Sequence, residues 1–304
     1  MYNVAAISSG LVEDGGKIFT QMISEADFMK DLEFIRGVKI PIALPKIEVT
    51  GGPRPYAATQ ETSGNAVVFS DRQLVVNQSK MDFPAIDVEI FRNKYLAKVQ
   101  NGEFDPSVVK FSTFIAREAV RKYLAKINDE VVWAGSYNAA GTTTAAIATG
   151  FGTIIAAEIT AGNLVPYTTG AITAANAVTK VEEFNNQLPS YLKSQKVIID
   201  CSYDVFQKYR THYRTLNTFG FKPNEKNEYQ LDGSNTILVP RTWMGNSQRL
   251  VARPDIEKNL YFGVDADSVQ VFATPRLNLI DVRLMMPLGM QIGDIKAIWV
   301  NDQA

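Results

Sequence analysis

The chain has 304 residues, 46% of them hydrophobic, and its 31 basic and 32 acidic residues leave a formal net charge of −1. That length supports one elaborate domain or two simpler ones with a substantial core, and the even charge balance gives no sign of a nucleic-acid or polyanion binder. A single cysteine, Cys201, excludes an intramolecular disulfide and any cysteine-rich metal site.

No segment has the pattern of a membrane anchor. The N-terminus lacks the basic region and apolar core of a signal peptide. The uncharged stretch from Val131 to Ala157 is interrupted by glycine, threonine and asparagine, which makes it too polar to span a bilayer. We therefore expect a soluble protein that is made in the cytoplasm.

The first part of the chain predicts an arm followed by a hairpin. Residues 1–46 begin polar and irregular, with a short helix expected around Ser24–Ile35 and a proline-containing extended segment after it. Residues 47–83 consist of two β-type runs on either side of a turn, ETSGN, as in a long hairpin. Such a hairpin is only marginally stable unless something packs against it. Because the sequence offers no obvious internal partner, we predict contact with another subunit.

A long helix is the next major element. A helix at residues 84–100, with Pro84 at its start, precedes it. Asp105 is a good N-cap for the longer helix, and Pro106 suits its first position. Apolar residues recur along it at helical spacing: Val108, Phe111, Ile115, Val120, Tyr123, Ile127 and Val131. We interpret residues 106–134 as a rod on which a sheet and loops are mounted.

An α/β section follows a stretch of different composition. Residues 139–173 are rich in Ala, Thr and Gly with one charge, Glu158, which suits β-structure and tight loops. Two amphipathic helices come next, with apolar faces formed by Ala177, Val181, Phe184 and Leu188 and by Phe206, Tyr209, Tyr213 and Leu216. Strands are predicted at 196–200, 236–240 and 249–253, and Ser202 caps the second helix. Residues 269–304 predict further strands, and around 277–286 both faces are largely apolar, as in a strand covered on both sides.

Three features suggest chemistry, and each has a more ordinary explanation. His212 is the only histidine, which removes enzyme classes that need paired imidazoles, and we expect a polar residue on its helix. Cys201 lies ahead of a helix N-terminus, where thiol pKa values fall, but His212 is too far along that helix for a dyad. Gly150-Phe151-Gly152 resembles a dinucleotide fingerprint, yet Ile155 replaces its third glycine. We predict no catalytic, cofactor-binding or metal-binding residue.

The second half of the chain carries a family resemblance. Its features are an amphipathic helix ending in Leu188-Pro189, a strand leading into Ser202-Tyr203, a tyrosine-rich helix, the Leu238-Val239-Pro240 strand, and the run Asn259-Leu260-Tyr261-Phe262-Gly263-Val264-Asp265. With the order of elements, this pattern resembles the major capsid proteins of tailed bacteriophages, which share the fold named after phage HK97. The order of elements resembles the family over nearly the whole chain. The resemblance in individual residues covers about 170 to 290.

The resemblance implies an α+β, HK97-like capsid fold with five regions. They are an N-terminal arm at 1–46, an extended hairpin called the E-loop at 47–83, a P-domain at 84–172 with the spine helix 106–134, an α/β A-domain at 173–268, and returning strands at 269–304. It implies a structural protein, not an enzyme, that self-assembles as hexamers and pentamers into an icosahedral shell enclosing packaged double-stranded DNA. The shell would belong to the virion and form in the host cytoplasm.

The same resemblance implies partners and contact residues. The partners are other copies of the chain, separate scaffolding, portal and decoration proteins, and DNA contacted non-specifically, without a membrane or a cofactor. Arg54, Tyr56 and Arg72 of the hairpin are predicted at intersubunit contacts. The polar face of the spine helix is predicted to lie at the inner side of the shell or against a neighbour's arm, through Lys110, Arg117, Arg121 and Lys126.

Two alternatives stay open. An encapsulin uses the same fold to enclose cargo enzymes, and purified particles that hold protein instead of a genome would indicate it. An α/β enzyme would have to place Cys201 or scattered aspartates in a cleft. A monomeric or dimeric species with a defined ligand pocket would indicate that third reading.

Overall fold

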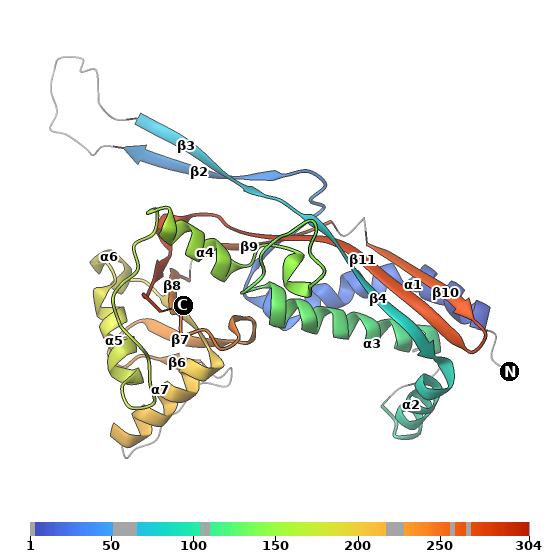
Figure 1. Ribbon diagram of the computed structural model, residues 1–304. Coiled ribbons are helices and arrows are strands. Elements are labelled where there is room, and N and C mark those ends of the chain that lie inside the picture. Colours follow the sequence, from blue (N-terminus) through green and yellow to red (C-terminus); the bar gives the residue numbers. More distant parts are fainter. Residues whose placement is uncertain are drawn as a thin grey trace.

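The computed structural model describes residues 4–50, 66–103, 105, 110–216, 228–255, 259–265 and 269–303. Figure 1 shows three parts: a long sheet lined by two helices, a second sheet with its own helices, and a two-stranded hairpin that projects from the body. Two predicted contact residues, Arg54 and Tyr56, lie outside the described residues.

Five strands form the first sheet, in the order β1-β9-β11-β10, and β4 also pairs with β11. Their bounds are β1 Glu33–Arg36, β4 Asn77–Asp87, β9 Leu260–Val264, β10 Gln270–Arg276 and β11 Leu279–Ile292. Strand β11 is antiparallel to β4, β9 and β10, whereas β1 runs parallel to β9. Helices α1 (Val4–Glu25) and α3 (Phe111–Lys126) lie along one face of this sheet and share the largest core with it (Figure 1).

The N-terminal stretch is helical, and the predicted irregular chain with a helix at Ser24–Ile35 is wrong. Helix α1 is followed by a 3-10 turn at Asp27–Lys30 and then by β1. Leu11 and Ile23 are almost fully buried in the core that α1 shares with α3 and β10. Three glycines in α1 lower its intrinsic helix propensity, so its packing rather than its local sequence stabilises the helix.

The long helix has the predicted apolar stripe but begins later than predicted. Lys110 is its N-cap residue instead of Asp105, and residues 106–109 lie outside the described part. After α3 the chain continues as a π-helical turn, Ile127–Val131. The predicted stripe is buried at Ile115, Val120, Tyr123, Ile127 and Val131.

Two shorter helices also correct the sequence prediction. Helix α2 (Val88–Gln100) does not begin at Pro84, which lies in β4. The Asp87 carboxylate fixes the helix start because it accepts hydrogen bonds from the next two free amides. Helix α4 (Phe151–Thr160) occupies a stretch that was expected to be β-structure and loops. Its first amides find carbonyl partners at the end of the π-helical turn, a long-range contact that the local composition does not reveal.

The second sheet and its helices match the sequence prediction. The strand order is β12-β8-β5-β7-β6, with β5 parallel to β7. The bounds are β5 Val197–Ser202, β6 Tyr229–Gln230, β7 Thr236–Arg241, β8 Val251–Pro254 and β12 Trp299–Val300. Helices α5 (Ala177–Gln187), α6 (Ser190–Lys193) and α7 (Tyr203–Leu216) enclose a separate core with it. The Ser202 hydroxyl caps α7 by accepting a hydrogen bond from the Val205 amide at 3.3 Å.

A buried charge cluster joins the N-terminal segment to the second sheet. Asp200 of β5 is fully buried, and its two oxygens accept hydrogen bonds from Nε of Arg241, at 2.5 Å, and Nε of Arg253, at 2.7 Å. Arg241 also pairs with Asp31, which precedes β1. Burial penalises the charge on Asp200, but the two arginines outweigh that effect and lower its pKa. Burial raises the pKa of Asp31 despite its contact with Arg241.

Strand β11 differs in part from the expected two-sided burial. From Leu279 to Met285 its side chains alternate between buried and more exposed positions, so one face of the sheet is open there. From Met286 to Met290 every residue is buried. The open side lies opposite α1 and α3 (Figure 1), whereas further along β11 the hairpin root at Val75 and Val76 and helix α4 lie against the strand.

Candidate functional site

The hairpin is the most prominent exposed element. Strands β2 (Ile42–Thr50) and β3 (Ala66–Leu74) pair antiparallel as a separate two-stranded sheet. Figure 1 shows the pair extending away from the rest of the chain. These strands correspond to the two β-type runs predicted around the turn, but β3 ends at Leu74, and Asn77 and its successors join β4. The buried core at its root is small and consists of Val38, Leu44 and Leu74.

Arg72 anchors the root of the hairpin to the body of its own chain. Its Nη1 lies 2.6 Å from Oε1 of Glu158 on α4, and its Nη2 donates to Oε1 of Gln291 on β11 at 3.0 Å. Gln291 in turn donates to the carbonyl of Gln73 at 2.9 Å. Burial raises the pKa of Glu158, but hydrogen bonds from Asn163 and Arg72 outweigh it and leave that pKa below its ordinary value. We name Arg72, Glu158 and Gln291 the clasp.

Two glycines let the hairpin root lie directly on the first sheet. A Cβ on Gly289 of β11 would stand 1.9 Å from the carbonyl oxygen of Val75. One on Gly263 of β9 would stand 2.8 Å from a methyl carbon of Leu74. Real Cβ atoms do not approach other atoms so closely: Gly289 faces backbone and needs glycine, whereas at Gly263 the Leu74 side chain would have to shift. The connection between β3 and β4 is therefore held against the sheet by shape as well as by the clasp.

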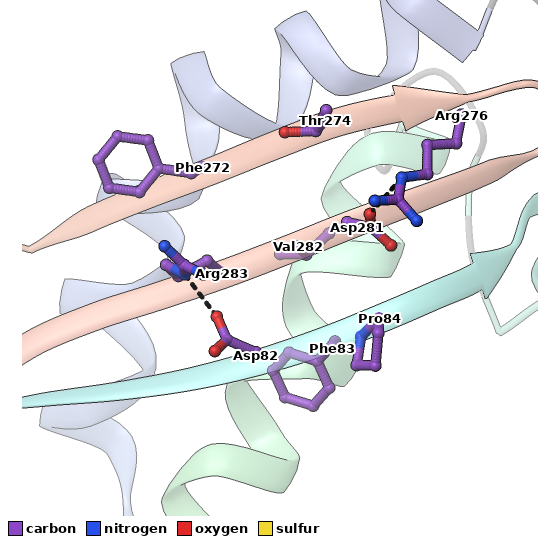
Figure 2. A pocket seen from close by; sticks show the side chains of 9 residues that line it. All are labelled: Asp82, Phe83, Pro84, Phe272, Thr274, Arg276, Asp281, Val282 and Arg283. Atoms are coloured by element: carbon purple, nitrogen blue, oxygen red, sulfur yellow. Dashed lines mark hydrogen bonds and ion pairs between the residues drawn. The ribbon is translucent and has the colours of Figure 1, made fainter.

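The open face of the first sheet is hollowed, and Figure 2 shows it with the helices behind it. Side chains from β4, β10 and β11 line a groove of about 500 Å³. Two cross-strand ion pairs lie in it, Asp82 with Arg283 at 2.5 Å and Arg276 with Asp281 at 3.0 Å (Figure 2). Phe272 stands among these charges and is 50% exposed. Sequence reasoning did not find this face; the alternation along β11 was its available signal.

The predicted polar residues of the long helix do not form one face. Lys110, Arg117 and Arg121 follow at spacings that bring them into line, whereas Lys126 lies about 140° round the helix from Arg121. All four are exposed. Arg121 pairs with Glu118 at 3.1 Å, and Lys126 pairs with Glu130 at 2.6 Å, a hydrogen bond that raises the pKa of Lys126.

The histidine and the cysteine have structural roles. His212 is buried on α7, and its Nδ1 accepts a hydrogen bond from the Val178 amide at 3.0 Å, so it caps the start of α5. Cys201 is fully buried beside the Val239 carbonyl, and burial raises the pKa of its thiol. Neither side chain is available for nucleophilic chemistry in this geometry.

Gly150 and Gly152, at the start of α4, lie against Trp133 beyond the π-helical turn. The Phe151 and Gly152 amides donate to the carbonyls of Val132 and Trp133 at 2.9 and 3.0 Å. Amides already bonded in this way cannot bind a phosphate. The stretch therefore resembles a dinucleotide fingerprint in sequence but cannot act as one. Among the described residues, no group of three His, Cys, Asp or Glu side chains is placed to hold a metal ion. The helices in the same part of the chain are too short or too polar to cross a membrane.

No family model and no curated protein matches the sequence. Several solved capsid structures are similar in fold, and they show that the chain has the fold of phage major capsid proteins. The satellite phage P4 procapsid, which includes the size determination (Sid) protein, has a TM-score of 0.57 at 12% identity and covers 94% of this chain and 89% of its own. The capsid of an empty GTA particle has a TM-score of 0.55 at 13% identity, covering 91% and 89%. The cyanophage A-1(L) capsid has a TM-score of 0.53 at 12% identity, covering 90% and 91%.

Proposed function

We propose that many copies of this chain assemble, as hexamers and pentamers, into an icosahedral shell that encloses packaged double-stranded DNA. The observation that carries the proposal is the capsid fold combined with a hairpin that projects from the subunit on a very small core. In this scheme the chain divides as an HK97-like subunit, with the E-loop at 47–83, the P-domain at 84–172, the A-domain at 173–268 and returning strands at 269–304. The segment 1–46 is the N-terminal region, with α1 as its helix.

The hairpin and the open sheet face are complementary parts of the proposed contact. A two-stranded hairpin is marginally stable alone, and the sheet face has Phe272 exposed among paired charges. If the hairpin of one copy covers this face on the next, the contact is heterologous and closes into rings. Arg54 and Tyr56 would then lie within the contact. Separate scaffolding, portal and decoration proteins would complete the particle in the host cytoplasm.

The opposite side of the first sheet is then the inner side of the shell. Helices α1 and α3 lie there (Figure 1), and the exposed Lys110, Arg117 and Arg121 follow one another along α3 and its N-cap. A few cations on that side would contact DNA phosphates without reading sequence. The near-zero net charge of the chain fits a container better than a protein that binds DNA tightly.

The test shortens the hairpin. Thr50 and Ala66 face each other across β2 and β3, so an Asn-Gly turn in place of residues 51–65 closes the hairpin without altering the strand register. We expect the shortened subunit to fold, with unchanged circular dichroism, and to form no closed shells by electron microscopy. Closed shells of normal diameter would show that the tip of the hairpin makes no essential contact.

The contents of the wild-type particles test the other half of the proposal. Particles made during phage production and treated with nuclease should retain protected double-stranded DNA. Particles that hold a protein cargo and no DNA would leave the shell in place and overturn the genome-packaging role. A stable monomer or dimer at high protein concentration would overturn the shell itself.

A further inference from the structure

We propose that the clasp of Arg72, Glu158 and Gln291 is a positioning device that sets the direction of the hairpin and thereby controls the regularity of the shell. This inference rests on the proposed function, in which the hairpin reaches the next copy. It goes beyond the sequence prediction of an intersubunit contact for Arg72, because the partners of the side chain described here lie within its own subunit.

A small rotation at the root of the hairpin produces a large displacement at its far end. The nine residues of β2 span about 30 Å in an extended strand, so a rotation of about 10° at the root moves the far end by about 5 Å. A displacement of that size is larger than a hydrogen bond and would misplace every contact made by the tip. Shells with uniform subunit contacts therefore require the hairpin to leave each subunit in a defined direction.

Few described contacts hold that direction. The β3–β4 connection at Val75 and Val76 lies on Gly289, which fixes a point but not an angle. The small root core adds apolar contacts close to the same point. Arg72 of the clasp lies on β3, further from the connection than Leu74 of the root core, and it ties β3 to α4 and β11. It is therefore placed to resist rotation about the connection.

The chemistry of the clasp suits a directional lock. The side chains of Arg72 and Glu158 are only 24% and 16% exposed, so their attraction is less screened by water than that of a surface pair. The planar guanidinium of Arg72 sends two N–H groups to two different acceptors, which fixes an orientation that a lysine ammonium does not. The Asn163 side chain holds the other Glu158 oxygen at 2.8 Å and keeps the acceptor in place.

The direct test measures the direction of the hairpin in unassembled subunits. Spin labels are attached through Glu48→Cys on β2 and Thr211→Cys on the exposed side of α7, and labelled chains are diluted into unlabelled ones. We expect a narrow distribution of label distances in the parent chain. Arg72→Ala and Arg72→Lys should both broaden it, and the charge-swapped pair R72E/E158R should narrow it again.

The matched control removes another short ion pair far from the hairpin. Lys196→Ala deletes the contact of Lys196 with Asp255, which is 2.5 Å long, and should leave the distribution narrow. A narrow distribution in Arg72→Ala, with the subunit still folded, would overturn the clasp. If Lys196→Ala broadened the distribution as much as Arg72→Ala, the effect would be a general loss of stability and the proposal would fail.

Electron microscopy then separates this inference from the proposed function. Arg72→Lys should assemble into particles with a wider spread of diameters than the parent, and R72E/E158R should recover the parental spread. Broad label distances with uniform particles would overturn the role in shell regularity. Absence of shells in the parent chain would refute the proposed function while leaving the directional lock to be judged by the label distances alone.

Discussion

At the residue scale, Asp200 shows how this chain keeps a full charge without exposed surface. A lone buried carboxylate is strongly unfavourable, and its charge persists because each oxygen has an arginine. The arginines in turn are buried and depend on the same carboxylate. Asp31 adds the fourth charge and brings the N-terminal segment into the cluster.

Asp200→Asn should therefore be among the most destabilising substitutions in the second sheet. It preserves shape but removes the direct ion-pair partner of the buried Arg253, which costs about 3–5 kcal/mol. Asp255→Asn is the matched control, because it removes the partner of the more exposed Lys196 and should cost no more than about 1 kcal/mol. Urea unfolding of the unassembled subunit measures both losses. Equal losses would mean that burial of the cluster contributes little.

The wild type and the Asp200→Asn variant should also differ in how their stability depends on pH. The pKa of Asp200 is lower in the folded state than the ordinary 3.8, so its charged form stabilises the fold above about pH 4. That contribution is lost as the pH falls through the folded-state pKa. The Asp31 pKa is raised, and its protonation acts in the opposite direction. We expect the stability gap between wild type and Asp200→Asn to narrow between pH 7 and about pH 3; a constant gap would contradict this.

Arg72 marks the limit of residue-level prediction. The sequence predicted an intersubunit contact for it, which stays a prediction; within its own chain its partner is Glu158, 86 positions further along. In the sequence, Glu158 stands out as the single charge in a stretch rich in Ala, Thr and Gly. Such an isolated charge is often paired with a partly buried residue of opposite charge. What the sequence does not contain is the approach of α4 to the hairpin root. Arg54 and Tyr56 stay predictions.

At the element scale, prediction succeeded where a local pattern decides the structure. Helices α5 and α7 have complete apolar faces, and β5 is a short apolar run between them, so each is determined by its own residues. Helices α1 and α4 were missed because distant parts of the chain stabilise them. The glycines of α1 favour loop locally, and they are tolerated because the helix packs against α3 and β10.

Two adjacent glycines of α1 predict opposite effects of the same substitution. A Cβ on Gly15 would lie 2.9 Å from a Val271 methyl carbon, whereas the nearest atom to a Cβ on Gly16 is 3.9 Å away. Gly16→Ala should stabilise the subunit by about 1 kcal/mol through helix propensity. Gly15→Ala gains the same propensity but overpacks the contact with β10, which costs about 1–3 kcal/mol.

Thermal and urea unfolding of the two variants test the position of α1. The expected order of stability is Gly16→Ala above wild type and wild type above or equal to Gly15→Ala. If both substitutions stabilised the chain equally, α1 would not lie against Val271 in solution. The comparison needs no assembly, so it tests the subunit independently of its function.

At the scale of the whole molecule, the described subunit leaves two features that its own core does not complete. One is the hairpin, and the other is the open face of β4, β10 and β11. The proposed assembly gives both a common explanation, because each copy would supply one feature and receive the other. Most apolar side chains of α1, α3 and the second sheet lie in the two main cores instead.

Phe272→Glu tests whether that face is covered in the assembly. In the subunit the new carboxylate would stand opposite Arg283 in the strand register, so the fold should remain as stable as before to within about 1 kcal/mol. Within a contact, the added charge must be desolvated. A loss of only about 1.4 kcal/mol per contact already weakens association tenfold, and a shell repeats the contact many times.

Val12→Glu is the control, because Val12 is as exposed, at 51%, but lies on α1 at the other side of the sheet. Sedimentation and electron microscopy should show subunits without shells for Phe272→Glu and normal shells for Val12→Glu. The reverse result would place the intersubunit contact on the α1 side, and the open face would then be the inner surface of the particle. Because both variants keep the same net charge, the comparison isolates the location of the charge from its amount.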